Sequence, residues 1–197
     1  MSTIIMERIA ITGNFASGKS VVGQVIKKMN YSLIDVDEVV NKLYKTKELK
    51  DILQDRYQLT VFKKDGTVNK NFLRKLIFNN PNEKKYLEAI IWPRVWNYLE
   101  MWQYSQERRG VGRTFTIVPL LFEANWQNKF DKIWLIYSRP QDRLERAQIK
   151  RGVNQDLASK IIASQIPDEK KKSKVDIIIN NYGTIAELKQ NVKNILT

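Results

Sequence analysis

The sequence predicts an α/β protein built on a parallel β-sheet, in which short apolar strands alternate with helices along the chain. Three observations support this prediction. An apolar segment over residues 8–12 is followed by a glycine-containing loop and then by apolar residues at helical spacing. Further apolar segments recur downstream, separated by helical patterns. With 197 residues, the chain is long enough to bury one sizeable core and to carry insertions.

Five segments have the length and apolar composition of strands. They are residues 8–12, 31–34, 114–118, 132–137 and 176–179. Because strands and helices alternate, we expect a five-stranded parallel sheet in a three-layer α/β/α arrangement. Ligands of such a sheet bind at the carboxyl ends of its strands.

Capping residues predict several helix boundaries. Asn69 is a candidate N-cap, and Asn80 followed by Pro81 marks a second helix start. Pro93 is expected to break or kink the helical pattern that contains it. Thr184 begins a capping box with the sequence T-I-A-E ahead of a terminal helix. Other helices are expected from Lys19, from Asp37, over 138–152 and over 155–165, and residues 46–111 should be mostly helical.

The glycine-containing loop reads G-N-F-A-S-G-K-S and fits the phosphate-binding P-loop pattern G-x-x-x-x-G-K-[ST]. Glycines let backbone N–H groups approach phosphate oxygens, and a helix N-terminus adds unpaired N–H groups and its positive dipole end. Lys19 would reach the β- and γ-phosphates of a nucleotide, and the Ser20 hydroxyl would bind Mg²⁺. The predicted nucleotide-binding residues of this segment are Gly13, Asn14, Phe15, Ala16, Ser17, Gly18, Lys19, Ser20 and Val21.

Composition limits the chemistry that this chain can perform. It contains no cysteine and no histidine, so acid–base chemistry must fall to carboxylates, lysine or tyrosine. A metal would be held by oxygen ligands, which suits Mg²⁺. No apolar run is long enough to span a bilayer and no signal-peptide pattern is present, so we expect a soluble, cytoplasmic protein.

The net charge of +13 is distributed unevenly. Residues 42–85 carry twelve basic against five acidic groups, and residues 139–174 carry ten against five. Residues 1–41, which include the P-loop pattern, are neutral. A field of one sign gathers anions, which could be a phosphorylated small molecule or nucleic acid.

Carboxylates near the predicted strand ends are candidates for chemistry at the nucleotide. Asp35 and Asp37 follow the second strand, where a carboxylate can accept a proton from an attacking hydroxyl or hold a Mg²⁺-bound water. The third strand carries no aspartate, which leaves Glu123 as a further candidate. In an alternative interpretation, Asp37 only caps the next helix.

Arginines of the segment 138–152 are candidates for contacts with the transferred phosphate. Arg143, Arg146 and Lys150 share one helix face at spacing i, i+3, i+7, which is ordinarily a solvated charged face. Phosphoryl transfer needs cations near the developing charge, so Arg146 and Arg151 are candidate functional residues.

One further motif, N-K-F-D at residues 128–131, fits the guanine-reading pattern N-K-x-D of GTPases. In those proteins the motif follows a strand, whereas here it precedes one, and the chain contains no D-x-x-G. We therefore do not expect a GTPase.

Considered together, several short segments of the chain resemble the dephospho-CoA kinases, a P-loop family of the nucleotide-kinase type. The resemblance runs in order over nearly the whole chain. Its blocks are I-T-G at 11–13 continuing through the P-loop, L-I-D-V-D at 33–37, V-P-L-L-F-E at 118–123, L-E-R at 144–146 with Arg151, Q-I-P at 165–167 with Lys171, and D-I-I-I-N-N-Y-G at 176–183. The chain departs from the family pattern at Asn14 and Ala16, where glycine is more usual, and at Lys70 and Trp92, where arginine and histidine are usual.

The resemblance implies transfer of the ATP γ-phosphate to the ribose 3′-hydroxyl of dephospho-CoA, the last step of coenzyme A synthesis. By resemblance, Asp37 is the base on that hydroxyl, and Asp35 assists Mg²⁺ through water. Arg146 and Arg151 belong to a lid, and Asn181 lies near the adenine. The implied acceptor-binding residues are Asp37, Arg74, Leu120 and Glu123.

The resemblance also implies a division of the chain. Residues 1–45, 112–139 and 173–197 would form the nucleotide-binding core, 46–111 a helical acceptor-binding region, and 140–172 the lid. The expected partners are ATP with Mg²⁺ and dephospho-CoA, for a monomer without a membrane or nucleic-acid partner. Two alternatives stay open: a P-loop kinase with another anionic acceptor, and a non-catalytic P-loop protein whose basic faces bind nucleic acid.

Overall fold

The structure, a computed structural model, describes residues 5–151 and 155–197. The chain forms two compact units. The first comprises Met1–Asp35 and Ser105–Thr197, and the second comprises Val36–Tyr104. The second unit is thus inserted into the first between its second and third strands.

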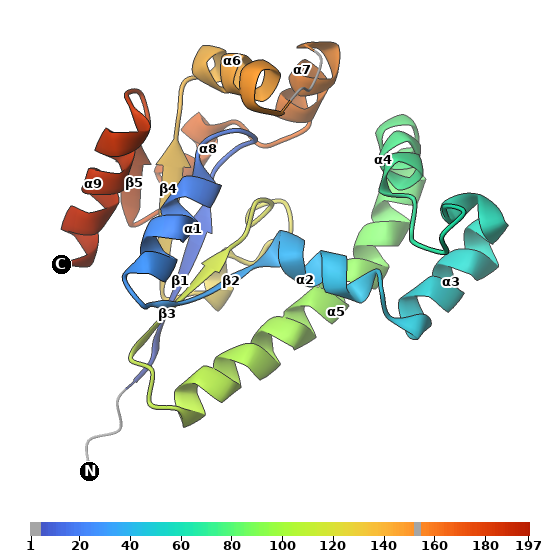
Figure 1. Cartoon of the computed structure of the whole chain (residues 1–197), viewed down its shortest axis with the longest axis horizontal. Coiled ribbons are helices and arrows are strands. Elements are labelled where there is room, and N and C mark those ends of the chain that lie inside the picture. The colour runs from blue at the N-terminus through green and yellow to red at the C-terminus, as the bar shows by residue number, and fades with distance from the viewer. Residues whose placement is uncertain (1–4, 152–154) are drawn as a thin grey trace. The chain divides into compact units, whose positions relative to one another are not determined.

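A five-stranded parallel sheet lies at the centre of the first unit (Figure 1). Its strands are β1 (Glu7–Thr12), β2 (Ser32–Asp35), β3 (Arg113–Ile117), β4 (Lys132–Tyr137) and β5 (Ile177–Asn180). They lie side by side in the order β2-β3-β1-β4-β5. The predicted fold class is therefore confirmed, and each strand agrees with its predicted range to within one residue at either end.

The strand order places a topological switch point at the carboxyl ends of β1 and β3. From β1 the chain crosses to β2, whereas from β3 it crosses to β4 on the other side of β1. The loops that follow the neighbouring strands β1 and β3 therefore leave in opposite directions. In parallel sheets such a switch point is where ligands bind, and here the P-loop follows β1.

Helices α1 (Lys19–Lys28) and α9 (Ile185–Leu196) pack against each other and against one face of the sheet (Figure 1). Alternate strand residues point to this face, as the period of two in a strand requires. Ile11, Phe115 and Ile136 meet Val25 and Val192 in one buried cluster. Burying each such side chain contributes about 1.5–3 kcal/mol, so this core fixes the helix that follows the P-loop.

Three further helices of the first unit lie in the segment predicted to be a lid. They are α6 (Pro140–Arg151), α7 (Gln155–Ala163) and α8 (Asp168–Lys172). The first two match the predicted helices. Helix α8 was not predicted, because five residues are too few to show an apolar period. A short 3-10 helix, η2 (Gln127–Lys129), precedes β4.

The second unit is helical, as expected. It contains α2 (Val36–Leu43), α3 (Lys47–Tyr57), the 3-10 helix η1 (Gln58–Val61), α4 (Lys70–Asn79) and most of α5 (Pro81–Arg108). Its own core is formed by buried side chains from α3, η1, α4 and α5, which shows that the unit is compact by itself. The principal members are Leu49, Leu53, Val61, Leu73 and Leu87.

The predicted helix caps are confirmed. Asn69 Oδ1 accepts from Phe72 N at 3.1 Å, and Asn80 Oδ1 accepts from Asn82 N at 3.0 Å. Thr184 forms a complete capping box at the start of α9. Each such cap satisfies backbone donors that the helix itself leaves unpaired.

Of the two predicted effects of Pro93, a break or a kink, the break is wrong, because α5 runs through the proline without interruption. A proline inside a helix costs about 3 kcal/mol through its missing N–H and its clash with the preceding turn. Leu87, Val95 and Leu99 are buried on both sides of the proline. Their burial outweighs that cost.

Within the described residues, no helix is long and apolar enough to cross a bilayer.

Candidate functional site

Two glycines of the P-loop occupy positions that only glycine can fill. Gly13 has φ 143° and Gly18 has φ 108°, conformations that residues with a Cβ rarely adopt. A Cβ at Gly13 would collide with the carbonyl oxygen of Ile136 in β4, and one at Gly18 would lie 2.5 Å from Asn181 Nδ2. The loop is therefore closed tightly against the segments at the ends of β4 and β5.

The conformation of Ala16 explains why glycine would suit this loop. With ordinary backbone angles, Ala16 would be tolerated at no cost, but the structure gives it φ 61°. A left-handed conformation costs a residue with a Cβ about 1–2 kcal/mol. Asn14 differs, because it does not have positive φ.

Helix α1 begins at Lys19, directly after the left-handed Gly18, and has no side-chain cap. The first backbone N–H groups of a helix have no partner within it and carry its positive dipole end, which favours an anion there. Ser20 follows in the same turn, and its side chain is exposed. The structure thus has the strand, loop and helix that the P-loop pattern requires.

The Lys19 side chain folds back over the loop. Its Nζ donates to the carbonyl oxygen of Gly13 at 2.5 Å and to that of Asn14 at 3.1 Å. These bonds hold the ammonium over the loop that would carry the phosphates. An ammonium has three N–H donors, so it can keep carbonyl partners while it binds a phosphate oxygen.

Arg146 and Asn181 lie together beside the start of α1. Arg146 donates to Ser138 Oγ at 2.8 Å and to the carbonyl oxygen of Asn181 at 3.0 Å. The side chain of Asn181 in turn donates to the carbonyl oxygen of Ser17 at 2.8 Å. One arginine of α6 is thereby tied to the P-loop through the residue that follows β5.

A pocket of about 150 Å³ lies at this place. Its lining comes from the P-loop, from the start of α1, from α6 and from the start of α9, so it brings predicted site residues from distant parts of the sequence together. They are Ala16, Gly18, Ser20, Val21, Arg146 and Asn181, with Gly183, Ile185 and Leu188.

The other side of the P-loop contacts the segment after α7. Asn14 is 1% exposed, and its Nδ2 donates to the carbonyl oxygen of Ile166 at 3.1 Å. The backbone N–H of Phe15 donates to Gln165 Oε1 at 2.7 Å. Asn14 and Phe15, two of the predicted nucleotide-binding residues, therefore also form hydrogen bonds within the protein.

Two predicted acceptor-binding residues lie in the turns after β3. Glu123 accepts from Ile166 N at 2.9 Å through Oε1, while Oε2 is buried without a hydrogen bond to any residue that the structure describes. Leu120 is partly exposed. The Glu123 contact shows that this carboxylate also has a role inside the protein.

The basic face of α6 differs from a solvated one at Arg143, which is 4% exposed. Its Nη1 lies 3.9 Å from Asp168 Oδ2. Burial lowers the pKa of Arg143 and raises that of Asp168. Arg151 is the last residue of α6, and its side chain lies outside the described residues.

The two candidate aspartates fall into different units. Asp35 ends β2, pairs in register with Ile117 of β3 and is half-buried at the carboxyl edge of the sheet. Asp37 is an exposed residue of the second unit. It is the second residue of α2, which begins at Val36, and so belongs to the first turn of that helix.

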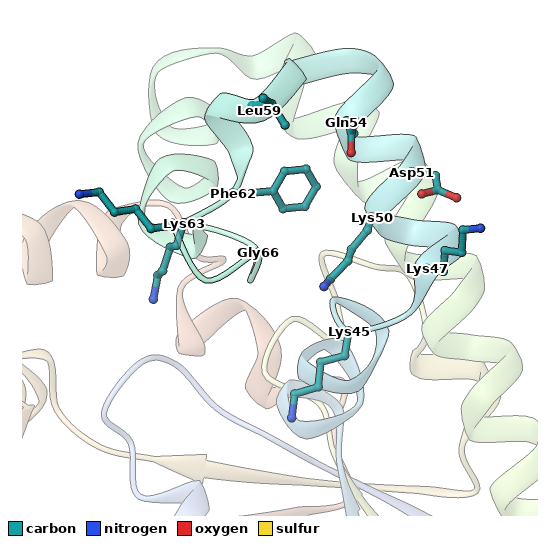
Figure 2. A pocket seen from close by; sticks show the side chains of 10 residues that line it. Lys45, Lys47, Lys50, Asp51, Gln54, Leu59, Phe62, Lys63 and Gly66 are labelled. Atoms are coloured by element: carbon teal, nitrogen blue, oxygen red, sulfur yellow. The ribbon is translucent and has the colours of Figure 1, made fainter.

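The second unit carries a basic pocket of about 700 Å³ between the end of α2, α3 and the loop after η1 (Figure 2). The ring of Phe62 points into it, with Lys50 nearby (Figure 2). Its other lining residues are Lys45, Lys47, Asp51, Gln54, Leu59, Lys63, Lys64 and Gly66.

Arg74 and Lys70 line a second pocket of the same unit, of about 580 Å³. Lys45, Lys50 and Lys63 line both pockets. Among the residues that the structure describes, the ammonium groups of Lys45 and Lys50 have neither an ion-pair nor a hydrogen-bond partner, whereas Lys63 has a Coulombic interaction with Asp65. Unpaired cations around a shared cavity attract anions.

The N-K-x-D motif has a structural role. Asp131 accepts from the backbone N–H of Arg8 at 2.7 Å and from its guanidinium at 3.2 Å. This pairing lowers the pKa of the carboxylate against the effect of burial. It fixes the start of β1, which agrees with the expectation that the motif does not read guanine.

A bound Mg²⁺ would depend on few protein ligands. Within the described part of the chain, no group of three or more acidic side chains could hold a metal ion. Ser20 offers one hydroxyl oxygen beside the helix N-terminus. Mg²⁺ commonly combines one or two protein oxygens with substrate phosphates and water, so this donor set fits it.

Comparison with known proteins agrees with the resemblance seen in the sequence. The family model described as dephospho-CoA kinase matches residues 7–187. The chain is 34% identical over 193 residues to a dephospho-CoA kinase of Streptococcus pyogenes serotype M1, and the match covers 95% of each chain. It is 30% identical over 190 residues to one of Staphylococcus aureus (strain bovine RF122 / ET3-1), covering 95% of this chain and 91% of that protein.

Solved structures agree in fold. The crystal structure of TT1252 from Thermus thermophilus matches with a TM-score of 0.80 at 27% identity, covering 97% of this chain and 96% of that one. A dephospho-CoA kinase from Campylobacter jejuni matches with a TM-score of 0.71 at 23% identity, covering 98% and 96%. At that lower identity, the second match supports the fold alone.

Proposed function

The chain belongs to the dephospho-CoA kinase family, and we propose that it transfers the γ-phosphate of ATP to the ribose 3′-hydroxyl of dephospho-CoA. The products are CoA and ADP, and the reaction is the last step of coenzyme A synthesis. The observation that carries the proposal is the P-loop, whose Lys19 lies over the loop in front of an uncapped helix N-terminus. Family membership supplies the acceptor.

We assign ATP binding to the P-loop and to the pocket beside it. The backbone N–H groups of the loop and of the start of α1 would bind the phosphates, with Lys19 on the β- and γ-phosphates. Asn181, which lines the pocket with Arg146, is the candidate contact for the adenine end. Arg146 would stabilise the charge that develops on the transferred group.

Mg²⁺ would be held by Ser20 and, through water, by Asp35. When bound, the ion would neutralise negative charge on the phosphates of ATP. Lys19 supplies positive charge to the same phosphates from the protein. The orientation of Lys19 is already set by its bonds to the loop carbonyls.

Asp37 is the proposed general base. Phosphoryl transfer requires the acceptor hydroxyl to lose a proton, and the chain has no histidine to receive it. The exposed Asp37 carboxylate can serve, and the L-I-D-V-D block that contains it is one of those that support family membership. Arg74, Leu120 and Glu123 are proposed to bind the acceptor.

We further propose that the second unit holds the anionic part of the acceptor and that residues 140–172 act as a lid. The unpaired lysines of the basic pocket support the first assignment, because dephospho-CoA carries a diphosphate. Arg146 supports the second, because α6 brings it to the nucleotide pocket. A cytoplasmic location stays a prediction.

The test is ADP release from Mg²⁺-ATP with dephospho-CoA, AMP, dTMP or no acceptor. Strong stimulation by dephospho-CoA alone, with CoA detected as product, is the expected result. Stimulation by another acceptor instead would establish a different P-loop kinase. ATP binding without stimulation by any acceptor, together with salt-dependent binding of DNA or RNA, would favour the non-catalytic alternative.

A further inference from the structure

We infer that Lys171 is a positioning residue of the nucleotide site, which acts through the side chain of Asn14 to hold the P-loop backbone and, with it, Lys19. The inference rests on the proposed function, because it assigns Lys171 to the ATP side of that reaction. All the groups involved belong to the first unit.

Lys171 and Asn14 are in direct contact. Lys171 Nζ donates to Asn14 Oδ1 at 2.5 Å, and both side chains are 1% exposed. The other end of the Asn14 amide donates to the carbonyl oxygen of Ile166. Both polar groups of this side chain are thus used, and they bind the P-loop to the segment that contains Lys171.

A lysine at the buried position 171 has an energetic cost. Burial lowers the pKa of Lys171, whereas the nearby carboxylates of Glu123, at 3.7 Å, and Asp168, at 3.9 Å, act to raise it. A buried ammonium is unfavourable unless such groups compensate it. Leucine or methionine could fill this buried position without the cost of burying a charge. We therefore expect the Lys171 ammonium to have a role other than packing.

Asn14 also contacts Lys19, the lysine of the P-loop. The carbonyl oxygen of Asn14 accepts from Lys19 Nζ at 3.1 Å and from the backbone N–H of Ser17 at 3.1 Å. Asn14 therefore contacts Lys171 through its side chain and Lys19 through its backbone. A shift of Asn14 would move the carbonyl group that orients Lys19.

A second connection makes the P-loop depend on the same segment. Phe15 N donates to Gln165 Oε1, and Ile166 N donates to Glu123 Oε1. Two consecutive P-loop residues are thus bound to the segment 165–171. These bonds would restrict the P-loop backbone at both residues.

The charges around Lys171 give the inference a second physical basis. Arg143, Asp168, Lys171 and Glu123 form a cluster of ion-pair contacts whose formal charges cancel. Loss of the lysine leaves two carboxylates against one guanidinium next to the P-loop. The excess negative charge would oppose a bound triphosphate, and it would do so while the fold of the loop persists.

The experiment compares Lys171→Met, Asn14→Ala and the double variant, with Lys172→Met as the matched control. Lys172 is the neighbouring lysine of α8 and pairs with Glu169 on the surface at 2.9 Å. ATP affinity is measured directly by calorimetry without acceptor, and kcat and both KM values are measured separately. Circular dichroism and thermal unfolding establish that each variant is folded.

We expect each single variant to weaken ATP binding about tenfold, as for loss of a hydrogen bond to a charged group, while the KM for the acceptor changes little. Because the two residues share the contact between Lys171 Nζ and Asn14 Oδ1, the double variant should lose less ATP affinity than the sum of the losses in the two single variants. Lys172→Met should match the wild type.

Unchanged ATP affinity in either folded single variant would overturn the inference, and so would fully additive effects. Should Lys171→Met fail to fold, unchanged ATP affinity in folded Asn14→Ala would still overturn the inference, since that variant removes the contact with Lys171 and leaves the four charged residues in place. Calorimetry with ATP needs no acceptor, so a wild-type protein inactive on dephospho-CoA would refute the proposed function without affecting this comparison.

Discussion

Arg146 in α6 and Asn181 after β5 are joined by a 3.0 Å hydrogen bond from the Arg146 guanidinium to the Asn181 carbonyl oxygen. The Asn181 side chain extends the connection to Ser17 of the P-loop. Ser17 and Asn181 are 164 residues apart in the sequence and Arg146 and Asn181 are 35 apart, yet their three segments meet at one pocket beside α1.

Arg146→Gln should lower kcat on the order of 10²–10³-fold, because the variant loses a preorganised positive charge at the transferred group. The KM for dephospho-CoA should change much less. Steady-state kinetics over both substrates measure this. A variant with full kcat would remove Arg146 from the catalytic residues, and Arg139→Gln, which changes a surface arginine paired with Asp142, provides the control.

Asp37→Asn should retain ATP binding and lose most of its turnover, by about 10²–10⁴-fold, because only the proton acceptor is removed. Single-turnover kinetics at saturating substrates measure the chemical step. Asp35→Asn provides the comparison: a loss that shrinks at high Mg²⁺ for Asp35→Asn but not for Asp37→Asn would match the proposed roles. Full turnover in Asp37→Asn would leave the base unassigned.

Lys19→Ala should lower kcat about 10²–10³-fold through lost charge stabilisation at the β- and γ-phosphates. The fold should persist, since Lys19 is only partly buried and its side chain donates to carbonyl groups of the P-loop rather than to a buried carboxylate. Activity and thermal unfolding are measured on the same preparation. Intact turnover would show that the P-loop assignment is wrong.

Lys50→Glu combined with Lys63→Glu should raise the KM for dephospho-CoA about tenfold or more, since each tenfold step corresponds to about 1.4 kcal/mol of lost attraction. Both lysines line the two basic pockets. The affinity for ATP should stay the same. Lys85→Glu is the control, because this exposed lysine of the second unit lines neither pocket. Equal KM values in the double variant and the wild type would place the acceptor elsewhere.

Glu83→Gln should destabilise the protein at neutral pH and cease to do so in acid. Arg56 and then Tyr57, through hydrogen bonds, lower the pKa of Glu83 from 4.5 to about 2. A carboxylate with a depressed folded-state pKa contributes stability above its unfolded pKa and loses that contribution as the pH falls through its folded pKa.

Urea unfolding of Glu83→Gln and the wild type at pH 7, 4 and 3 tests this expectation. The difference in unfolding free energy should be largest at pH 7 and decrease below about pH 4.5. Glu100→Gln, at an exposed site on the same helix α5, should show no such trend. A difference independent of pH would show that Glu83 contributes through packing rather than charge.

The P-loop and the helix caps could be predicted because their geometry is local. Gly13, Gly18 and Lys19 lie within seven residues, and each capping residue acts within the first turn of its helix. Strand positions followed from short apolar runs, and the five predicted strands are all present. The family could likewise be inferred, from the order and spacing of its blocks along the chain.

Pro93 shows where local inference failed. The residue type argues for an interrupted helix, but buried side chains on either side decide for a continuous one. Arg143 is a second example, because its helical spacing is ordinarily that of a solvated face, whereas the structure buries this residue. Asp168, twenty-five residues away in the sequence, provides the charge that allows it to be buried.

By itself, then, the sequence determined the fold class, the nucleotide loop and the family, because spacing within a few residues sets local backbone geometry and ordered blocks identify relatives. Only the tertiary structure decided that Asn14 binds Lys171 and that Arg146 reaches Asn181. Partners far apart in the chain leave no local pattern, because what brings them together is the packing of the sheet and its helices.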